Sequence, residues 1–560
     1  MSHSKITLSP VFIISIYCLL TACSGARDQK SPVSHQGKAE KPVASFTDGL
    51  KDLIASTLNH GGKLNDSVEL TNLDLIDSTY NANQYEPIWS KQQHWLPLGD
   101  SLFRFIEHSK EFGLFPSDYH FPALAFVHRV FEADSIGRKN LLLWERADLI
   151  LTDAFFTLVR HLKQGRLSYD SVTLRTDTVL VSDMYRNALE SALQTGSIAG
   201  PLHSLEPRYK GYDSLRAYIG NFLLKAEFKP YTYLKYPYSD SVSFFKLVEK
   251  RLHEVGELSP EKAGLDTLAF QKIFRKYQKD HGLKITSRLS DQLVDRLNQT
   301  DWEKFKKIAV NLDRYKQLPD TLPATRAWVN LPAYTLDVFN SDTLVFQSRV
   351  IVGGPNTRTP LLTSEISNFI TFPQWTVPFS IIMKEMLPKI QQNVEFLTKE
   401  NLMVVDSNDS IIDPNTVKWA KLNKNHFPYL LKQRQGDDNS LGVIKFNFRN
   451  KYSVYMHDTN VRGKFNNAYR AISHGCVRVK DWSKLANFLT RNDTLRYHPD
   501  TLTAWIKRQE KHMVSGFLRL PLYFRYFTCE GKDGRIKFYD DIYEEDRYLR
   551  EKYFADKVIQ

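Results

Sequence analysis

A cysteine and a histidine in the last third of the chain have the spacing of a nucleophile and its base. Residues Ser473–Arg478 are Ser-His-Gly-Cys-Val-Arg, and His457 stands 19 positions before Cys476. A thiol attacks a carbonyl as its thiolate, so it needs a base within hydrogen-bond reach, and histidine is the usual one. It also needs N–H donors for the oxyanion that forms. The pattern predicts acyl transfer through a cysteine nucleophile.

The residues beside Cys476 suit this chemistry. Gly475 lets the backbone bend sharply and expose N–H groups to an oxyanion. His474, Arg478 and Lys480 add positive charge, which favours the thiolate. The sequence therefore predicts a reactive thiol in positive surroundings. The simpler interpretation is a small buried cysteine beside an ordinary loop histidine.

Two other kinds of site use the same residue types. His457, His474 and Cys476 are candidate zinc ligands, but no fourth ligand stands at metal-like spacing. Papain-like proteases place the cysteine before the histidine, whereas here His457 comes first. We therefore expect neither a metal site nor a papain-like site.

The first residues predict export and a lipid anchor. A polar start with Lys5 precedes an apolar run at 11–20, which is too short for a permanent membrane helix and suits a secretory signal. The run ends in Leu20-Thr21-Ala22-Cys23, which resembles the bacterial lipobox. We expect a signal peptide at 1–22 and lipidation of Cys23. An ordinary signal peptide with a chance cysteine is the alternative.

The cysteine count sharpens the prediction for Cys476. Four cysteines are present, at 18, 23, 476 and 529, and the first two belong to the export signal and the anchor. The remaining pair could form a disulfide in an oxidising compartment. Cys529 follows the apolar stretch 522–528, where a small buried side chain is expected. We predict that Cys476 is reactive and Cys529 structural.

Length and composition predict a globular protein of several domains. The chain has 560 residues, of which 42% are hydrophobic, and its formal net charge is +12. Such a charge suits an acidic polymer or an anionic membrane as well as nucleic acid. No basic arm or zinc-finger spacing occurs, so we expect no nucleic-acid partner.

Hydrophobic periodicity divides the chain before the reactive segment. We expect a flexible tether at 23–48, because it is polar and rich in Ser, Lys and Pro. A helical scaffold follows at 49–235, with the clearest periodicity at 141–167. A compact helical unit at 236–300 has predicted helices at 242–255, 268–281 and 291–298, and a linker helix lies within 301–326.

From residue 327 the pattern changes to strands. Alternating or β-branched runs predict strands at 328–331, 335–339, 346–352, 369–372, 442–446 and 453–457. A more helical block rich in Lys and Asn, at about 380–440, interrupts them and is expected to be a lid. A helix and strands at 497–560, including 520–529 and 535–539, should pack on the catalytic or scaffold part. The fold class is therefore α+β and multi-domain, with a mostly β catalytic domain at 327–496.

The combination of His457-Asp458-Thr459 with Ser473–Arg478 resembles the catalytic signature of the L,D-transpeptidases. Segments 329–334, 350–354, 359–360 and 375–378 look like further landmarks of that domain. Segments 85–89 and 538–543 resemble the large, multi-domain Gram-negative branch of the family. Phe270–Leu283 resembles the small peptidoglycan-binding helical module, although the Gly-rich segment expected next is replaced by 285–290. A purely structural three-helix spacer is the alternative there.

The resemblance implies a role for each site residue. Cys476 is the nucleophile, His457 its base, and the backbone at Gly475 and Cys476 supplies oxyanion donors together with the Tyr455 hydroxyl. Ser473, His474 and Arg478 shape the site, and Arg478 holds a substrate carboxylate. In this family a backbone carbonyl orients the histidine. We therefore assign no third, acidic member, because adjacent strand side chains such as that of Asp458 point to opposite faces.

The implied activity is peptidoglycan cross-linking without a cofactor. Cys476 would attack the third stem residue, release D-Ala and pass the acyl group to an amine on a neighbouring stem, which gives a 3-3 cross-link. Carbapenems would acylate the same thiol. The alternatives are an L,D-carboxypeptidase or cross-link hydrolase that uses this thiol, and a non-catalytic wall-binding lipoprotein. Expected partners are stem peptides, the periplasmic face of the outer membrane and other cell-wall synthesis enzymes.

Overall fold

The computed structural model describes residues 45–167, 181–259, 264–281, 283, 285–555 and 557. The predicted signal peptide, Cys23 and most of the tether lie outside these residues. Residues 46–560 form one compact unit. Among the described helices, none has the length and apolarity needed to cross a membrane.

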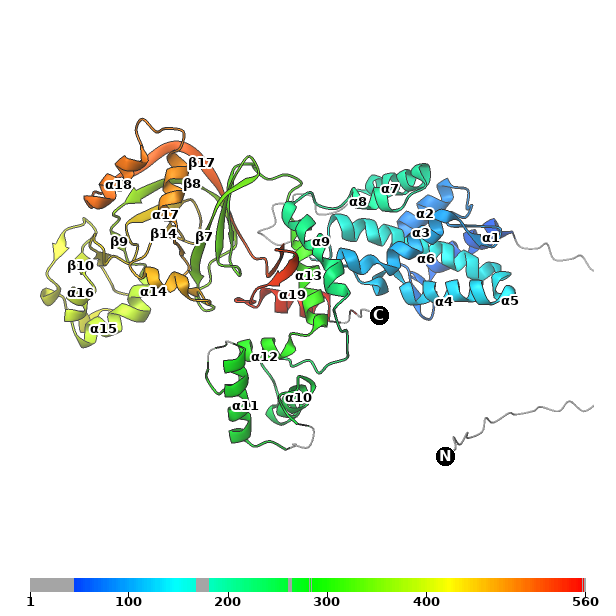
Figure 1. The fold of residues 1–560 in the computed structure, drawn as a ribbon, viewed down its shortest axis with the longest axis horizontal. Helices are drawn as coiled ribbons and strands as arrows, with labels where there is room; N and C mark the ends of the chain where they lie inside the picture. Colours follow the sequence, from blue (N-terminus) through cyan, green and yellow to red (C-terminus); the bar gives the residue numbers. More distant parts are fainter. Residues whose placement is uncertain are drawn as a thin grey trace, which may run out of the picture. The chain divides into compact units, whose positions relative to one another are not determined.

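Helices form the first part of this unit, as predicted (Figure 1). The long helix α6, Leu141–Lys163, is almost entirely buried, which explains its apolar periodicity. Around it lie the helices α1 (Phe46–Asn59), α2 (Leu73–Ala82), α3 (Pro97–Glu107), α4 (Phe121–Ala133), α5 (Ser135–Arg138), α7 (Ser182–Thr195) and α8 (Ala199–His203). α9 (Lys210–Leu223) follows.

A buried carboxylate on α6 fixes the loop at 85–89 against this helix. Asp148 is fully buried and accepts hydrogen bonds from the Tyr80 hydroxyl at 2.6 Å and the Ile88 N–H at 2.8 Å. It also accepts from the Trp89 N–H at 3.1 Å and the Ser90 hydroxyl at 2.9 Å. Because the Ile88 and Trp89 N–H groups would otherwise be unpaired in the core, Asp148 orders the loop.

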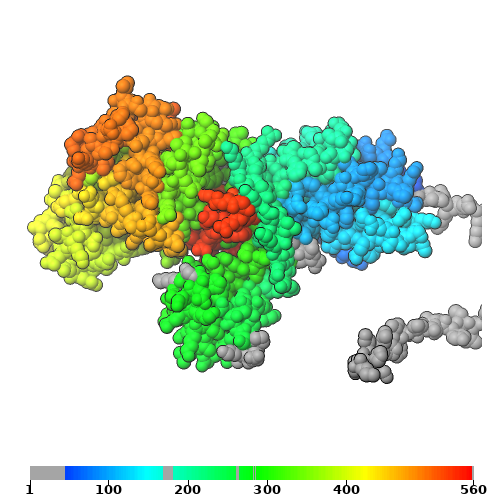
Figure 2. Space-filling model, in the orientation of Figure 1, coloured from blue at the N-terminus to red at the C-terminus, as the bar shows by residue number. Residues whose placement is uncertain are grey.

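The predicted three-helix unit is confirmed and has its own core. α10 (Ser241–Glu254), α11 (Thr267–Asp280) and α12 (Asp291–Asn298) bury Phe244, Phe274 and Leu293 against one another. Each helix begins at a side-chain cap, which is Asp240, Asp266 or Ser290. Figure 2 shows these helices, in green, packed closely together.

The segment expected to be a linker helix is instead a central core element. α13 (Asp301–Lys316) buries twelve of its residues, and Phe305 and Leu312 lie in one cluster with Phe115, Tyr212 and Phe554. The cluster therefore joins the scaffold, α9 and the end of the chain. The helix itself was predicted within 301–326, but its burial on several sides depends on segments far away in the sequence, which no local pattern shows.

Asn311 illustrates how α13 holds the C-terminal strands. It is fully buried, donates to the Thr528 hydroxyl at 2.8 Å and accepts from the Thr528 N–H at 2.8 Å. We expect Asn311→Ala to lower the free energy of unfolding by about 2–3 kcal/mol, because the Thr528 N–H would remain buried without a partner. Urea denaturation measures the change, and Asn408→Ala, at an exposed position, should stay within about 0.5 kcal/mol of the wild type. Equal effects of the two substitutions would contradict this role.

The catalytic part is a closed sheet. Nine strands pair in the order β15-β7-β16-β14-β13-β8-β17-β5-β6, and β6 also pairs with β7, which closes the sheet into a barrel. Their bounds are β5 Arg326–Asn330, β6 Thr335–Asn340, β7 Thr343–Gly353, β8 Leu362–Thr371, β13 Ile444–Phe448, β14 Met456–His457, β15 Ala471–Ser473, β16 Val477–Val479 and β17 Met513–Arg525. The helix α17 (Trp482–Thr490) adds Leu485 and Leu489 to the apolar core.

One predicted strand is much shorter than expected. The run at 453–457 forms a strand only at Met456–His457, because the side-chain oxygen of Asn450 accepts the N–H groups of Tyr452 and Val454 and turns the chain. Ser453 has a φ of 57°, which also interrupts an extended strand. The chain continues from this turn directly into the segment of Tyr455 and His457.

The insertion is a small mixed domain with its own core, where a helical block was expected. It begins with β9 (Trp375–Thr376), α14 (Phe379–Ile381), the π-helical turn η3 (Ile382–Met386), α15 (Leu387–Gln392) and α16 (Glu395–Lys399). The strands β10 (Leu402–Val405), β11 (Ile411–Ile412) and β12 (Leu430–Gln433) then pair in the order β11-β10-β12-β9. β12 thus returns beside β9, so the two ends of the insertion meet.

The C-terminal segment packs on both the catalytic and the scaffold parts. After α18 (Pro499–Lys507), β17 enters the barrel between β8 and β5. The predicted strand at 520–529 therefore starts earlier, at Met513, and ends at Arg525. A hairpin of β18 (Cys529–Lys532) and β19 (Arg535–Phe538) contacts α9, and α19 (Glu545–Tyr553) packs against α13.

Candidate active site

Two neighbouring strands of the barrel bring the predicted site residues together. β14 and β16 run parallel, with Met456 beside Val477 and His457 beside Arg478. The Val477 N–H donates to the Tyr455 carbonyl at 3.1 Å, which continues this register toward Cys476. Because side chains alternate along a strand, Tyr455, His457, Cys476 and Arg478 share one face. His457 and Cys476, which are 19 positions apart in the sequence, are thus brought to adjacent strands.

The Cys476 thiol is half-buried and has a raised pKa. Burial is the largest cause, since it penalises the thiolate. The Tyr455 backbone and hydroxyl and the charges of Lys445 and Arg478 act in the opposite direction. At neutral pH the resting group is therefore the thiol, which needs a base before it can attack.

The Tyr455 hydroxyl lies between the thiol and the insertion. It accepts a hydrogen bond from Trp375 Nε1 at 3.0 Å and interacts with the Cys476 sulfur. Burial and the neighbouring Cys476 raise its pKa well above the usual range, so the hydroxyl keeps its proton. It can therefore donate to a thiolate or to an oxyanion beside it.

His457 is buried and neutral at physiological pH. Burial and the positive charge of Arg478 lower its pKa to about 3. Its Nδ1 makes no hydrogen bond with the described residues. The backbone groups of Asp458 and Leu441 act on the pKa in the opposite direction and raise it. A neutral imidazole can accept a proton, so the group has the ionisation state that a general base requires.

Asp458 does not act as a partner of this histidine. Its carboxylate pairs with the Arg462 guanidinium and accepts the Val443 N–H at 3.1 Å. This agrees with the expectation that adjacent strand side chains point to opposite faces. The carboxylate instead holds the turn in front of β13.

The loop before Cys476 is held by a compact hydrogen-bond network. The Ser473 hydroxyl donates to the Cys476 carbonyl at 2.6 Å and accepts from the Gly475 N–H at 3.2 Å. Gly475 has a φ of 115°, which only glycine adopts readily, and its carbonyl accepts from Thr359 Oγ1 at 2.8 Å. Because Ser473 engages the Gly475 N–H at rest, the Cys476 N–H is the better-placed backbone oxyanion donor.

Arg478 and His474 occupy different positions relative to the thiol. Arg478 is half-buried, contacts Thr459 Oγ1 at 3.4 Å, and has a buried Nε without a hydrogen bond in the described part of the chain. Such a donor suits a substrate carboxylate. His474 is instead exposed, and its Nε2 lies 2.7 Å from Glu385 in the insertion. Lys480 is also exposed.

Three contacts of the site were not predicted from the sequence. Lys445 lies opposite His457 in the β13–β14 pairing, and its Nζ is 4.2 Å from the centre of the Tyr455 ring. Burial lowers its pKa, and the neighbouring Cys476 raises it. Trp375 and Glu385 reach the site from the insertion. None of the three stands near His457 or Cys476 in the sequence. Trp375 lies in the landmark segment 375–378, but the sequence assigned it no contact with the site, and no pattern indicated Lys445 or Glu385.

Lys445 should tune the thiol more strongly than Lys480. We expect Lys445→Met to raise the pKa of Cys476 further and to slow its alkylation at pH 7–8 severalfold, because a nearby positive charge favours the thiolate. Rates of iodoacetamide alkylation against pH measure the effect. The matched control Lys480→Met removes an equal charge at an exposed position and should leave the profile unchanged. A larger shift in the control would rule out this role for Lys445.

Comparisons with known proteins match two parts of the chain to known domains. Residues 324–497 match the model of the L,D-transpeptidase catalytic domain, and residues 74–219 match that of the Scaffold domain. A curated Haemophilus influenzae protein, whose name assigns it provisionally to the L,D-transpeptidases, is 33% identical over 252 residues. The match covers 44% of this chain and 49% of that protein, so it spans about half of the relative's length.

Solved structures of L,D-transpeptidases also match at low identity. A cysteine-to-serine variant of the Enterococcus faecium enzyme is 12% identical, with a TM-score of 0.17 and coverage of 48% of this chain and 86% of that one. The carbamoyl enzyme of Ldtfm with avibactam has the same identity and TM-score, with coverage of 56% and 96%. On the domain matches, residues 324–497 are an L,D-transpeptidase catalytic domain, on a chain that also holds a Scaffold domain at 74–219.

Proposed function

We propose that this protein is a peptidoglycan L,D-transpeptidase that forms 3-3 cross-links. The observation that carries the proposal is that a half-buried thiol, Cys476, and a neutral buried imidazole, His457, stand at the ends of adjacent strands of the matched catalytic domain. This pairing supplies a nucleophile and a base without a metal or cofactor. The stem peptide as substrate follows from the family.

The proposed reaction has two acyl-transfer steps. His457 takes the proton of Cys476 as sulfur bonds to the carbonyl carbon of the third stem residue, and the oxyanion lies near the Tyr455 hydroxyl and the Cys476 N–H. The intermediate collapses to a thioester, and His457 returns the proton to the departing D-Ala amine. An amine of a neighbouring stem then attacks the thioester, and the thiol regains its proton.

The insertion supports the proposal as a lid over the site. Trp375 contacts the Tyr455 hydroxyl, and Glu385 pairs with His474 beside the nucleophile. We expect a bound stem peptide to slow hydrogen exchange within 380–440, because closure orders the insertion and excludes water. Exchange measured by mass spectrometry on a Cys476→Ser protein tests this. Unchanged exchange in this range, with slower exchange in 455–480, would argue against a lid.

The acceptor distinguishes transpeptidation from hydrolysis. Both reactions share the thioester, and an amine competes with water at roughly 55 M only if it is held at high effective molarity. A covered cleft with room for an acceptor favours the amine. The purified protein is given disaccharide-tetrapeptide and an isotopically labelled acceptor stem, and the products are identified by mass spectrometry. Labelled dimer is expected, whereas tripeptide without labelled dimer would establish the hydrolase alternative.

The N-terminal anchor and the three-helix unit complete the proposal. Lipidation at Cys23 would hold the enzyme at the outer membrane, facing the wall, and multiple acyl chains give stable anchoring. Incorporation of a fatty-acid analogue should disappear in Cys23→Ala, and persistence of the label would refute the anchor. The unit at 236–300 would contact the glycan, while the alternative is a structural spacer between α9 and α13.

A further inference from the structure

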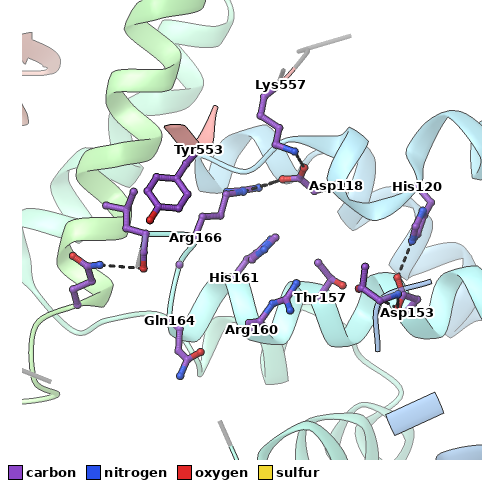
Figure 3. A pocket seen from close by; sticks show the side chains of 14 residues that line it. Asp118, His120, Asp153, Thr157, Arg160, His161, Gln164, Arg166, Tyr553 and Lys557 are labelled. Carbon is purple, nitrogen blue, oxygen red and sulfur yellow. Dashed lines mark hydrogen bonds and ion pairs between the residues drawn. The ribbon is translucent and has the colours of Figure 1, made fainter. Parts of the chain in front are cut away.

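A polar cavity of about 570 Å³ lies in the scaffold region, with none of its lining residues in the catalytic barrel. Its walls come from the end of α6, the segment that follows it, the loop before α4 and the end of the chain (Figure 3). This volume falls in the range of pockets that bind small ligands. The proposed reaction at Cys476 makes no use of it.

Both carboxylates of the cavity are already saturated with donors. Asp118 pairs with the Arg166 guanidinium and with Lys557 Nζ, the latter at 2.9 Å. Asp153 lies 2.7 Å from His120 and also accepts the N–H groups of Thr71 and Asn72. Figure 3 shows the two clusters apart from each other, with the Asp153–His120 pair at the right. Neither carboxylate therefore needs a bound cation or another hydrogen-bond donor.

The polar groups that still lack partners are donors. The Arg166 side chain is 6% exposed, yet its Nη1 is buried without a hydrogen bond, and the same holds for Gln164 Nε2 in the described part of the chain. Arg160 lines the cavity and forms no ion pair with the described residues. Since buried donors are normally paired, the cavity lacks acceptors and negative charge.

His161 lies near several positive charges of the cavity. It lies beside Arg160 at the end of α6 (Figure 3) and contacts the Tyr119 hydroxyl at 2.9 Å. Burial lowers its pKa well below the usual range, and the charges of Arg166 and Arg160 lower it further. The imidazole is therefore neutral, chiefly because it is buried and also because Arg166 and Arg160 lie near it.

We propose that this cavity is a second, non-catalytic site for a carboxylate-bearing ligand of about the size of a sugar–peptide unit. Arg160 and Arg166 Nη1 would meet the carboxylate, and Gln164 Nε2 would donate to a neighbouring acceptor. Stem peptides of the wall carry such carboxylates, and small free polycarboxylates share the chemistry. A stem peptide bound here would hold its glycan strand at a distance from the Cys476 thiol.

Binding to the full-length Cys476→Ser protein tests the proposal, since this protein does not turn the ligand over. Disaccharide-tetrapeptide is titrated by calorimetry against this protein with and without Arg160→Gln. We expect Arg160→Gln to weaken one of two binding events at least tenfold and to abolish ligand-dependent protection from hydrogen exchange within 153–166. Arg160→Lys should restore part of the affinity. The control Arg186→Gln, at an exposed position of the scaffold, should change neither quantity.

A second titration identifies the source of the carboxylate. Citrate replaces the muropeptide in the same protein pair. Arg160-dependent binding of citrate alone would assign the site to a free polycarboxylate, and binding of the muropeptide would assign it to the wall. If neither ligand binds in an Arg160-dependent way, the proposal is wrong. Turnover of the Arg160→Gln protein with its thiol intact is measured separately, so failure here leaves the proposed reaction at Cys476 unaffected.

Discussion

Replacing Cys476 with alanine should abolish acyl-enzyme formation and lower turnover by about 10⁴-fold or more, because the nucleophile is lost and only binding and oxyanion stabilisation remain. Mass spectrometry of the intact protein after incubation with a carbapenem should show no adduct. Turnover of the disaccharide-tetrapeptide should fall to the detection limit. The two measurements together separate a lost nucleophile from weaker binding.

The matched control is Cys529, the other cysteine of the described residues. Cys529 is fully buried in the cluster around α13, its sulfur contacts the Lys307 carbonyl at 3.9 Å, and it forms no disulfide. We expect Cys529→Ala to keep the carbapenem adduct and most of the turnover, with a stability loss of about 1 kcal/mol from the cavity. An adduct that persists in Cys476→Ala and vanishes in Cys529→Ala would reverse the assignment.

Replacing His457 with glutamine should lower the rate of acylation by about 10²- to 10⁴-fold, the usual contribution of a general base. The pKa of His457 is about 3, so the imidazole is neutral and competent throughout the physiological range and loses activity only as pH falls toward that value. Burial holds the pKa of Cys476 above its usual value, so the wild-type thiol should not exist as a preformed ion pair.

Alkylation and stability profiles check these ionisation states. Iodoacetamide should react with wild-type Cys476 at a rate that rises with pH, without a plateau between pH 5 and 8. A plateau there would indicate a thiolate–imidazolium pair and contradict a neutral His457. Because the histidine titrates near 6.5 when unfolded and near 3 when folded, its contribution to stability is complete above pH 6.5 and declines as pH falls toward 3. His457→Gln should reduce this acid sensitivity.

Local sequence patterns predicted helices and strands correctly where residues close together in the sequence determine the structure. The helix at 291–298 agrees with its prediction, since Ser290 caps it and its apolar side faces one core. The helix α13 was predicted, but its place in the core was not, because the segments that bury it lie far away in the sequence, including the chain end at Phe554. The strand at 453–457 failed because Asn450 forms a turn whose hydrogen bonds outweigh the strand propensity.

By itself, the sequence determined the chemistry that is available: a thiol beside a glycine, a histidine 19 positions earlier, and a run of predicted strands to carry them. Only the tertiary structure decided which charges act on that thiol. Lys445 acts on it through the pairing of β13 with β14, whereas His474 is drawn to Glu385 and Lys480 faces solvent. The physical reason is that electrostatic interactions depend on distance and burial, which strand pairing sets and separation along the chain does not.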